Sequence, residues 1–84
     1  MKAIRLSNHA RARMQQRGAT EVEVTETIRT APWRDAERGR HECRKDFPFN
    51  REWNGKVYAS KQIRPIFVEE AQEILVVPIY VYYA

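Results

Sequence analysis

The stretch of residues 7–23, SNHARARMQQRGATEVE, decides the fold because it contains the start and end signals of a first helix and the start of a second. Ser7 or Asn8 can accept hydrogen bonds from the free N–H groups of a helix start. We therefore expect a helix over about residues 9–17. Gly18 then supplies the left-handed residue with which helices commonly end.

The second helix begins at the capping box of Thr20-Glu21-Val22-Glu23 and should end near Ala31, before Pro32. Two helices joined by so few residues predict an antiparallel helical hairpin. The apolar stripe of each helix is thin, with Ala10 and Met14 on the first. Such helices need a sheet on which to pack.

The rest of the chain is typical of strands. Residues 2–6 alternate polar and apolar side chains, which predicts a short first strand. Asn54-Gly55 is a strong signal for a hairpin turn between a strand that ends near Trp53 and one over residues 56–68. The last strand is expected over residues 73–83. Residues 33–42 are polar and charged, and we expect an exposed loop or an edge strand there. The predicted fold is α+β: a mostly antiparallel four-stranded sheet in the order β-α-α-β-β-β, with the helical hairpin packed on one face.

Two-residue turns at Asn54-Gly55 and Glu70-Ala71 would fix the register of the sheet. They pair Trp53 with Lys56, Phe49 with Ser60, Phe47 with Gln62, Ile66 with Leu75 and Lys61 with Tyr80. Because side chains alternate along a strand, the helices should cover the face made by Phe47, Phe49, Trp53, Tyr58, Ile66, Val68, Leu75, Val77, Ile79 and Val81. The opposite, partly open face would hold Lys61, Ile63, Phe67, Ile74, Val76, Pro78, Tyr80 and Tyr82.

The last strand carries two opposing signals. It is apolar on both faces, which indicates a central position in the sheet. Pro78 favours an edge or a bulge instead, because proline has no N–H to donate to a neighbouring strand. The sequence leaves both placements open.

Length and composition restrict the class of protein. The 84 residues predict a single domain over residues 1–84. One cysteine excludes an internal disulfide, and no spacing of cysteine and histidine is typical of a zinc site. We predict neither a signal peptide nor a membrane helix, because no apolar run reaches the roughly 20 residues that a span needs. The expected location is the cytoplasm.

The net charge of +4 favours a polyanionic partner. Residues 1–18 hold five basic side chains and no acidic one, and residues 33–64 hold nine basic and five acidic ones. These two basic blocks could converge on one surface and bind nucleic acid. The alternative is a solvated surface charge that serves solubility.

His9, Arg13 and Arg17 follow one another at helical spacing, so they should form one stripe on the first helix. A helix start with arginines nearby can hold a phosphate. An imidazole can transfer protons near neutral pH. The alternative is a polar stripe that faces only water.

Residues 9–18, HARARMQQRG, resemble the H-A-R-x-R-M-x-x-R-G signature of a family of small uncharacterised bacterial and archaeal domains. Residues 20–28, 58–70 and 73–80 also resemble that family. It is grouped with the RelE/ParE-like toxins, among metal-independent ribonuclease folds. The resemblance departs at Pro78, where many relatives carry threonine.

The resemblance implies a metal-independent endoribonuclease of the toxin–antitoxin type, in which the 2′-hydroxyl of RNA attacks the adjacent phosphate. It implies His9 as general acid or base, Arg13 as phosphate clamp, Lys61 as a second charge for the transition state, and Tyr80 for proton donation or base stacking. The basic candidates for holding RNA are Arg5, Arg11, Arg17 and Arg64.

The partners expected from this hypothesis are RNA, either free or as messenger RNA on the ribosome, and an acidic antitoxin protein. No cofactor, metal or membrane is expected. The competing hypothesis is a noncatalytic module of the same fold that binds nucleic acid or an acidic protein through the same basic stripe.

Overall fold

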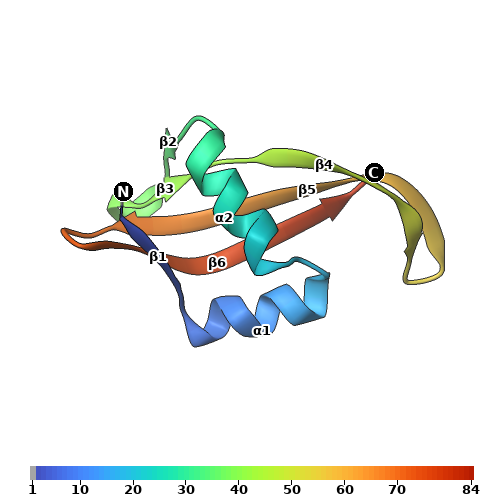
Figure 1. Ribbon diagram of the computed structural model, residues 1–84, viewed down its shortest axis with the longest axis horizontal. Helices are drawn as coiled ribbons and strands as arrows, with labels where there is room; N and C mark the ends of the chain where they lie inside the picture. The colour runs from blue at the N-terminus through green and yellow to red at the C-terminus, as the bar shows by residue number, and fades with distance from the viewer. Residues whose placement is uncertain (1) are drawn as a thin grey trace.

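The computed structural model describes residues 2–84. Two helices and six strands make one α+β unit (Figure 1). In chain order the elements are β1 (Ala3–Leu6), α1 (Asn8–Arg17), α2 (Glu21–Thr30), β2 (Arg34–Asp35), the short turn η1 (Glu37–Gly39), β3 (His41–Glu42), β4 (Lys45–Trp53), β5 (Lys56–Glu69) and β6 (Glu73–Tyr83). Within the described residues no helix is long and apolar enough to cross a membrane.

The helix boundaries confirm the capping signals of the sequence. The Ser7 hydroxyl accepts a hydrogen bond from the Ala10 N–H at 3.0 Å, and α1 ends at Gly18 with a left-handed φ of 78°. At the start of α2, Thr20 and Glu23 form both bonds of the capping box. Local hydrogen bonding therefore fixes where each helix begins.

The predicted sheet was wrong in strand number, order and direction. The structure has a six-stranded mixed sheet in the order β1-β6-β5-β3-β2, with β4 also paired to β5. β1 runs parallel to β6, while the other pairs are antiparallel. The two additional strands, β2 and β3, lie in the charged stretch of residues 33–42. Their two-residue length gives no alternating pattern that a sequence could display.

The register at the Asn54-Gly55 turn is as predicted, with Trp53 opposite Lys56. Farther along, a bulge between Pro48 and Arg51 changes the pairing, so that Phe47 lies opposite Lys61 and Pro48 opposite Ser60. Asn50 lies in this bulge with a φ of 50°. One extra residue on β4 is enough to overturn the predicted pairs of Phe47 with Gln62 and Phe49 with Ser60.

A second bulge reconciles the two opposing signals of β6. The first half of this strand is central, between β1 and β5, and Pro78 lies where the β5–β6 register shifts between Pro65 and Phe67. There, Ile66 alone opposes Val77 and Pro78. A proline is tolerated at this point because the ladder is interrupted.

The β5–β6 turn also differs from the prediction. The Glu70 N–H donates to the Glu73 carbonyl at 2.8 Å, which places the turn one residue later than expected. Leu75 therefore pairs with Val68, and the later turn together with the β6 bulge places Lys61 opposite Tyr83. The predicted pairs of Ile66 with Leu75 and Lys61 with Tyr80 were wrong.

The assignment of faces changes accordingly. The helices cover the face that carries Lys61, Ile63, Pro65, Phe67, Ile74, Val76, Ile79 and Val81, which are all buried; we call this the covered face. The other side, which we call the open face, carries Arg64, Ile66, Val68, Leu75, Val77, Pro78, Tyr80 and Tyr82, which are half-buried or exposed. Ile79, Val81 and Phe47 confirm the predicted covered set, as do Phe49, Trp53 and Tyr58, whose rings lie against Tyr83 at the end of α1. The other predicted covered residues, Ile66, Val68, Leu75 and Val77, lie on the open face. Pro78, Tyr80 and Tyr82 confirm the predicted open set.

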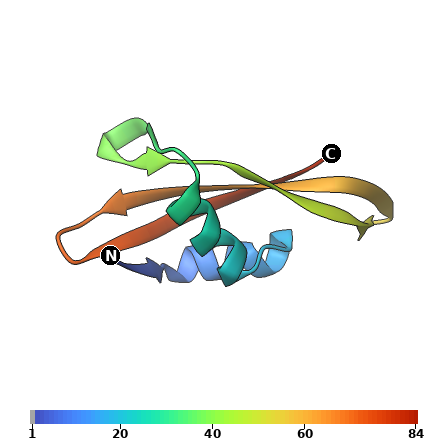
Figure 2. The same ribbon diagram turned by 45° about the horizontal axis from the view of Figure 1, so that its top comes forward.

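The helices contribute Ala10, Met14, Val24 and Ile28 to the core beneath the covered face. Figure 2 shows both helices on one side of the sheet and the η1 turn on the other. The residues that carry charge and aromatic rings on the open face thus lie away from the helical layer.

Candidate functional site

The stripe of His9, Arg13 and Arg17, which we call the α1 stripe, lies beside β6. These three residues line a small cavity of about 90 Å³ together with Pro78, Ile79 and Tyr80. Helical spacing aligns the stripe, and the β6 bulge turns Tyr80 to the open face, where its side chain is 42% exposed. The structure therefore brings together four of the residues predicted from sequence.

Ser7 holds the start of α1 against β6. Its N–H donates to the Val76 carbonyl at 3.0 Å, and its hydroxyl donates to the Val77 carbonyl at 3.2 Å. His9 lies two residues farther, in the first turn of the helix, where free N–H groups favour an anion. The first turn contains no acidic side chain that would compete for that position.

Tyr83 holds the other end of α1. Its hydroxyl donates to the Arg17 carbonyl at 2.7 Å, and its ring stacks on Trp53 with centroids 5.1 Å apart. Burial raises the pKa of the Tyr83 hydroxyl, with the charge of Glu23 adding to the effect. The neutral phenol is the form that donates this bond.

Lys61 does not join the site. It is buried on the covered face at 3% exposure, and its ammonium donates to the Gly18 carbonyl and the Glu23 carboxylate, each at 2.9 Å. These contacts tie the α1–α2 turn to the sheet. The expectation that Lys61 and Tyr80 share the open face was wrong, because the β6 bulge at Val77 and Pro78 adds one residue between the β5–β6 turn and Tyr80 and so places the two residues on opposite faces.

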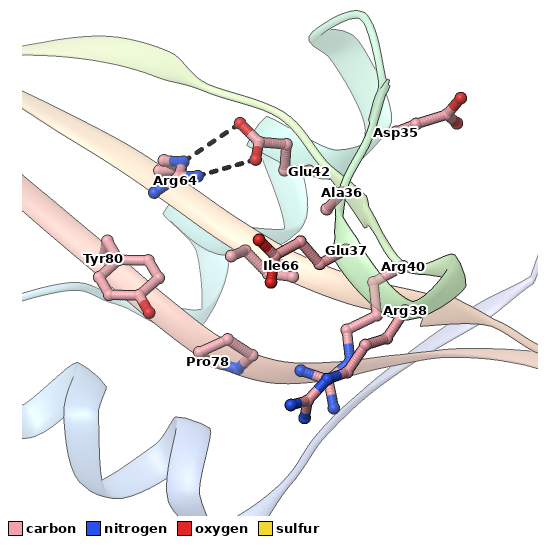
Figure 3. A pocket seen from close by; sticks show the side chains of 10 residues that line it. All are labelled: Asp35, Ala36, Glu37, Arg38, Arg40, Glu42, Arg64, Ile66, Pro78 and Tyr80. Carbon is pink, nitrogen blue, oxygen red and sulfur yellow. Dashed lines mark hydrogen bonds and ion pairs between the residues drawn. The ribbon is translucent and has the colours of Figure 1, made fainter.

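Arg64 lies on the open face, as part of a second cavity of about 750 Å³ that adjoins the first through Pro78 and Tyr80 (Figure 3). Its guanidinium donates to both carboxylate oxygens of Glu42, at 3.2 and 2.8 Å, and to the Tyr82 hydroxyl at 3.3 Å. It also lies over the Tyr80 ring, 5.2 Å from the centroid. Arg64 thus orients the two tyrosines of the open face.

Glu42 is a residue of this site that the sequence analysis did not single out. The hydrogen bonds from Arg64 hold the pKa of its carboxyl below the usual range, against the opposing effect of burial. The same bonds and charge raise the pKa of Arg64 above its ordinary value. Nothing in the sequence marks Glu42, because its pairing with Arg64 depends on the two-residue strand β3.

The η1 turn adds Arg38 and Arg40 to the second cavity. Figure 3 shows both side chains pointing from the turn toward the end of the cavity where Pro78 lies. The sequence indicated only that residues 33–64 are rich in basic side chains.

The remaining predicted basic residues lie elsewhere. Arg5 on β1 pairs with Glu73, with 2.6 Å between Nε and Oε2. Arg11 points away from the stripe and lies 3.8 Å from Glu21. Neither lines the two cavities.

Cys43 and His41 are of residue types that often take part in catalysis, but here both side chains pack within the fold. Cys43 is buried at 2% exposure, and burial raises the pKa of its thiol to about 11. His41 packs against Trp33 and Phe67, with ring centroids 5.5 and 5.9 Å away. Residues 2–84 contain no cluster of three or more His, Cys, Asp or Glu side chains that could hold a metal ion.

Comparisons with known proteins add no further assignment. No protein-family model, curated protein or solved structure matches this chain. The interpretation of the site therefore rests on its own geometry.

Proposed function

We propose that this protein is a metal-independent endoribonuclease of the toxin–antitoxin type. The observation that carries the proposal is the cavity shared by His9, Arg13, Arg17 and Tyr80. It combines a side chain that can transfer protons, two fixed positive charges and a phenol. These are the groups that cleavage of RNA through its own 2′-hydroxyl requires.

In the proposed reaction, the 2′-oxygen of RNA loses its proton and forms a bond to the adjacent phosphorus. The bond from phosphorus to the 5′-oxygen breaks, and that oxygen gains a proton. The products are a 2′,3′-cyclic phosphate and a 5′-hydroxyl. His9 accepts or donates one of the two protons, and Tyr80 donates a proton or stacks on a base. Arg13 and Arg17 stabilise the additional negative charge on the phosphate.

The location of this site supports RNA as the substrate. The α1 stripe and the open face adjoin at Pro78 and Tyr80, and the two cavities that they line are open to solvent. A flexible single strand can lie across such a surface with its phosphates on arginine and a base on tyrosine. We place the protein in the cytoplasm, where RNA, free or on the ribosome, is available, and we propose an acidic antitoxin as its partner protein.

A noncatalytic module that binds nucleic acid or an acidic protein is the second candidate. Pro78 favours it, because this residue lines the small cavity and contributes no hydroxyl. Such a module would use the α1 stripe for binding and leave RNA intact.

The test is cleavage of an end-labelled RNA by purified protein in EDTA. We expect cleavage with 2′,3′-cyclic ends, reduced about 100-fold or more in His9→Ala and by about 100-fold in Arg13→Gln. Arg29→Gln is the matched control, because it removes the same charge from α2, where Arg29 is exposed and, among residues 2–84, donates a side-chain hydrogen bond only to the Lys2 carbonyl.

Each other outcome has a distinct meaning. Equal cleavage by the wild type and both site variants would overturn the site assignment. Intact RNA that is retarded in a gel and released by salt would favour the binding module. Intact RNA without retardation would overturn free RNA as the substrate and lead to a test on translating ribosomes.

A further inference from the structure

Two arginines of the η1 turn have no charged partner. Arg38 and Arg40 form no ion pair or side-chain hydrogen bond with any of residues 2–84 (Figure 3). The neighbouring Arg64 and Arg44 both interact with Glu42, at 2.8 and 3.6 Å. The basic charge of the second cavity is thus divided into a neutralised part beside β3 and an unneutralised part near Pro78.

Backbone hydrogen bonds of the turn hold Arg38 and Arg40 beside the open face. The Ala36 N–H donates to the Arg40 carbonyl at 2.8 Å, and the Arg40 N–H donates to the Glu37 carbonyl at 3.2 Å. An anion between two like charges of one cavity offsets their mutual repulsion. Guanidinium groups match the oxygens of a phosphate, to which they can donate two bonds each.

The position of Arg38 and Arg40 indicates which molecule would supply the phosphate. The cavity of Arg38 and Arg40 and the cavity of the α1 stripe share Pro78 and Tyr80. One single strand that crosses these two residues therefore places its backbone in both cavities. The Tyr80 ring between them offers a surface on which the intervening base can stack.

We propose that Arg38 and Arg40 form a second phosphate subsite, which holds a phosphate of the same RNA strand one step or more from the phosphate at the α1 stripe. The proposal deepens the proposed function, because it rests on RNA as the ligand of the open face. The protein then needs at least two phosphates for full affinity.

An acidic residue of the cavity offers a control in which removal of a charge should raise the affinity for phosphate. Asp35, Glu37 and Glu42 also line the cavity, and Figure 3 shows the Asp35 carboxylate pointing away from the other lining residues. Glu42 is held by Arg64, but the Glu37 side chain has no partner among residues 2–84. Glu37 therefore lowers the affinity of the subsite for phosphate, and its removal should raise that affinity.

Binding of 2′-O-methyl oligonucleotides, which cannot be cleaved through the 2′-oxygen, tests the proposal separately from catalysis. The probes are a dinucleotide with one phosphate and a tetranucleotide with three. We expect the wild type to bind the tetranucleotide at least about 10-fold more tightly. The double variant Arg38→Gln/Arg40→Gln should bind the dinucleotide and the tetranucleotide with equal affinity. For the tetranucleotide, log affinity should fall less steeply with log salt, with the magnitude of the slope smaller by about 0.7. Glu37→Gln should enlarge the difference, and Arg29→Gln should leave it unchanged.

Several results would overturn the subsite. One is equal affinity of the wild type for the dinucleotide and the tetranucleotide. Another is a difference between the two probes that remains in the double variant. A third is binding of polyglutamate as strong as that of the tetranucleotide, which would make Arg38 and Arg40 a surface for acidic proteins. Failure of the proposed function is distinguishable. A wild type that shows the expected length dependence but cleaves no RNA retains the subsite and loses the nuclease. Cleavage with unchanged binding in the double variant retains the nuclease and loses the subsite.

Discussion

The basic side chains on the two sides of β5 differ in burial and in their partners. On the covered face, Lys61 is 3% exposed, and its ammonium donates to the Gly18 carbonyl and the Glu23 carboxylate. On the open face, Arg64 is held by Glu42, but Arg38 and Arg40 beside it have no partner among residues 2–84. Burial makes an unpaired charge very costly, whereas water tolerates it. A basic residue that is fully partnered therefore serves the fold, and one that is left unpartnered over a cavity is free for a ligand.

The largest expected effect comes from removing the counter-charge of Lys61. Glu23→Gln keeps an acceptor for the capping box but leaves a buried ammonium without a carboxylate. We expect a loss of about 3–5 kcal/mol in the free energy of unfolding, measured in urea. Glu21→Gln is the control on the same helical turn. Its ion pair with Arg11 is long and exposed, so its removal should cost less than about 0.5 kcal/mol. Equal losses in both variants would contradict the structural role of the buried Lys61–Glu23 pair.

The next effect concerns two of the three left-handed glycines, Gly18 near the covered face and Gly39 near the open face. A Cβ at Gly18 would lie 2.6 Å from the Tyr83 hydroxyl and 2.8 Å from the Trp53 ring, whereas at Gly39 it would meet nothing within 4 Å. Gly39→Ala should lose about 1 kcal/mol for its positive φ alone. Gly18→Ala should lose about 2–3 kcal/mol, because the clash adds to that strain. Thermal unfolding of both variants measures the difference, and equal values would show that Gly18 is not tightly packed.

The smallest effect is on the open face itself. Glu42→Gln weakens the pairing with Arg64 and should lower the free energy of unfolding by about 1–2 kcal/mol at pH 7. The pKa of Glu42 is lowered in the folded protein, so its contribution is present above the unfolded pKa of about 4.3 and is lost as the pH falls through the folded value. The difference between wild type and variant should therefore shrink toward pH 3 in urea titrations. A difference that is constant with pH would mean that the pair does not stabilise the fold.

The sequence predicted those parts of the molecule that local chemistry decides. Ser7, Gly18 and the Thr20 capping box set the helices, and Asn54-Gly55 set the central hairpin. It did not predict the sheet, because the parallel pairing of β1 with β6 joins residues about 70 positions apart and leaves no local signal. The family resemblance stays a prediction.

The candidate site was predicted in part for a related reason. The α1 stripe depends only on helical spacing, and its residues do line one cavity. The pairing of Lys61 with Tyr80 depended on a register without bulges, and a single extra residue turns a strand over. Asn50, which tolerates a positive φ, and Pro78, in a strand with apolar side chains on both faces, were the available signals of these bulges.

The central claim is that the chemistry lies with the α1 stripe and the open face, while Lys61 serves the fold. The most direct test measures the rate of RNA cleavage by His9→Ala and by Lys61→Met. Both variants are assayed at a temperature where they are folded, and each rate is divided by the concentration of folded protein. We predict that His9→Ala loses at least about 100-fold in rate with unfolding unchanged, and that Lys61→Met keeps its rate although its unfolding free energy changes. The opposite pattern, full activity in His9→Ala and its loss in folded Lys61→Met, would contradict the account.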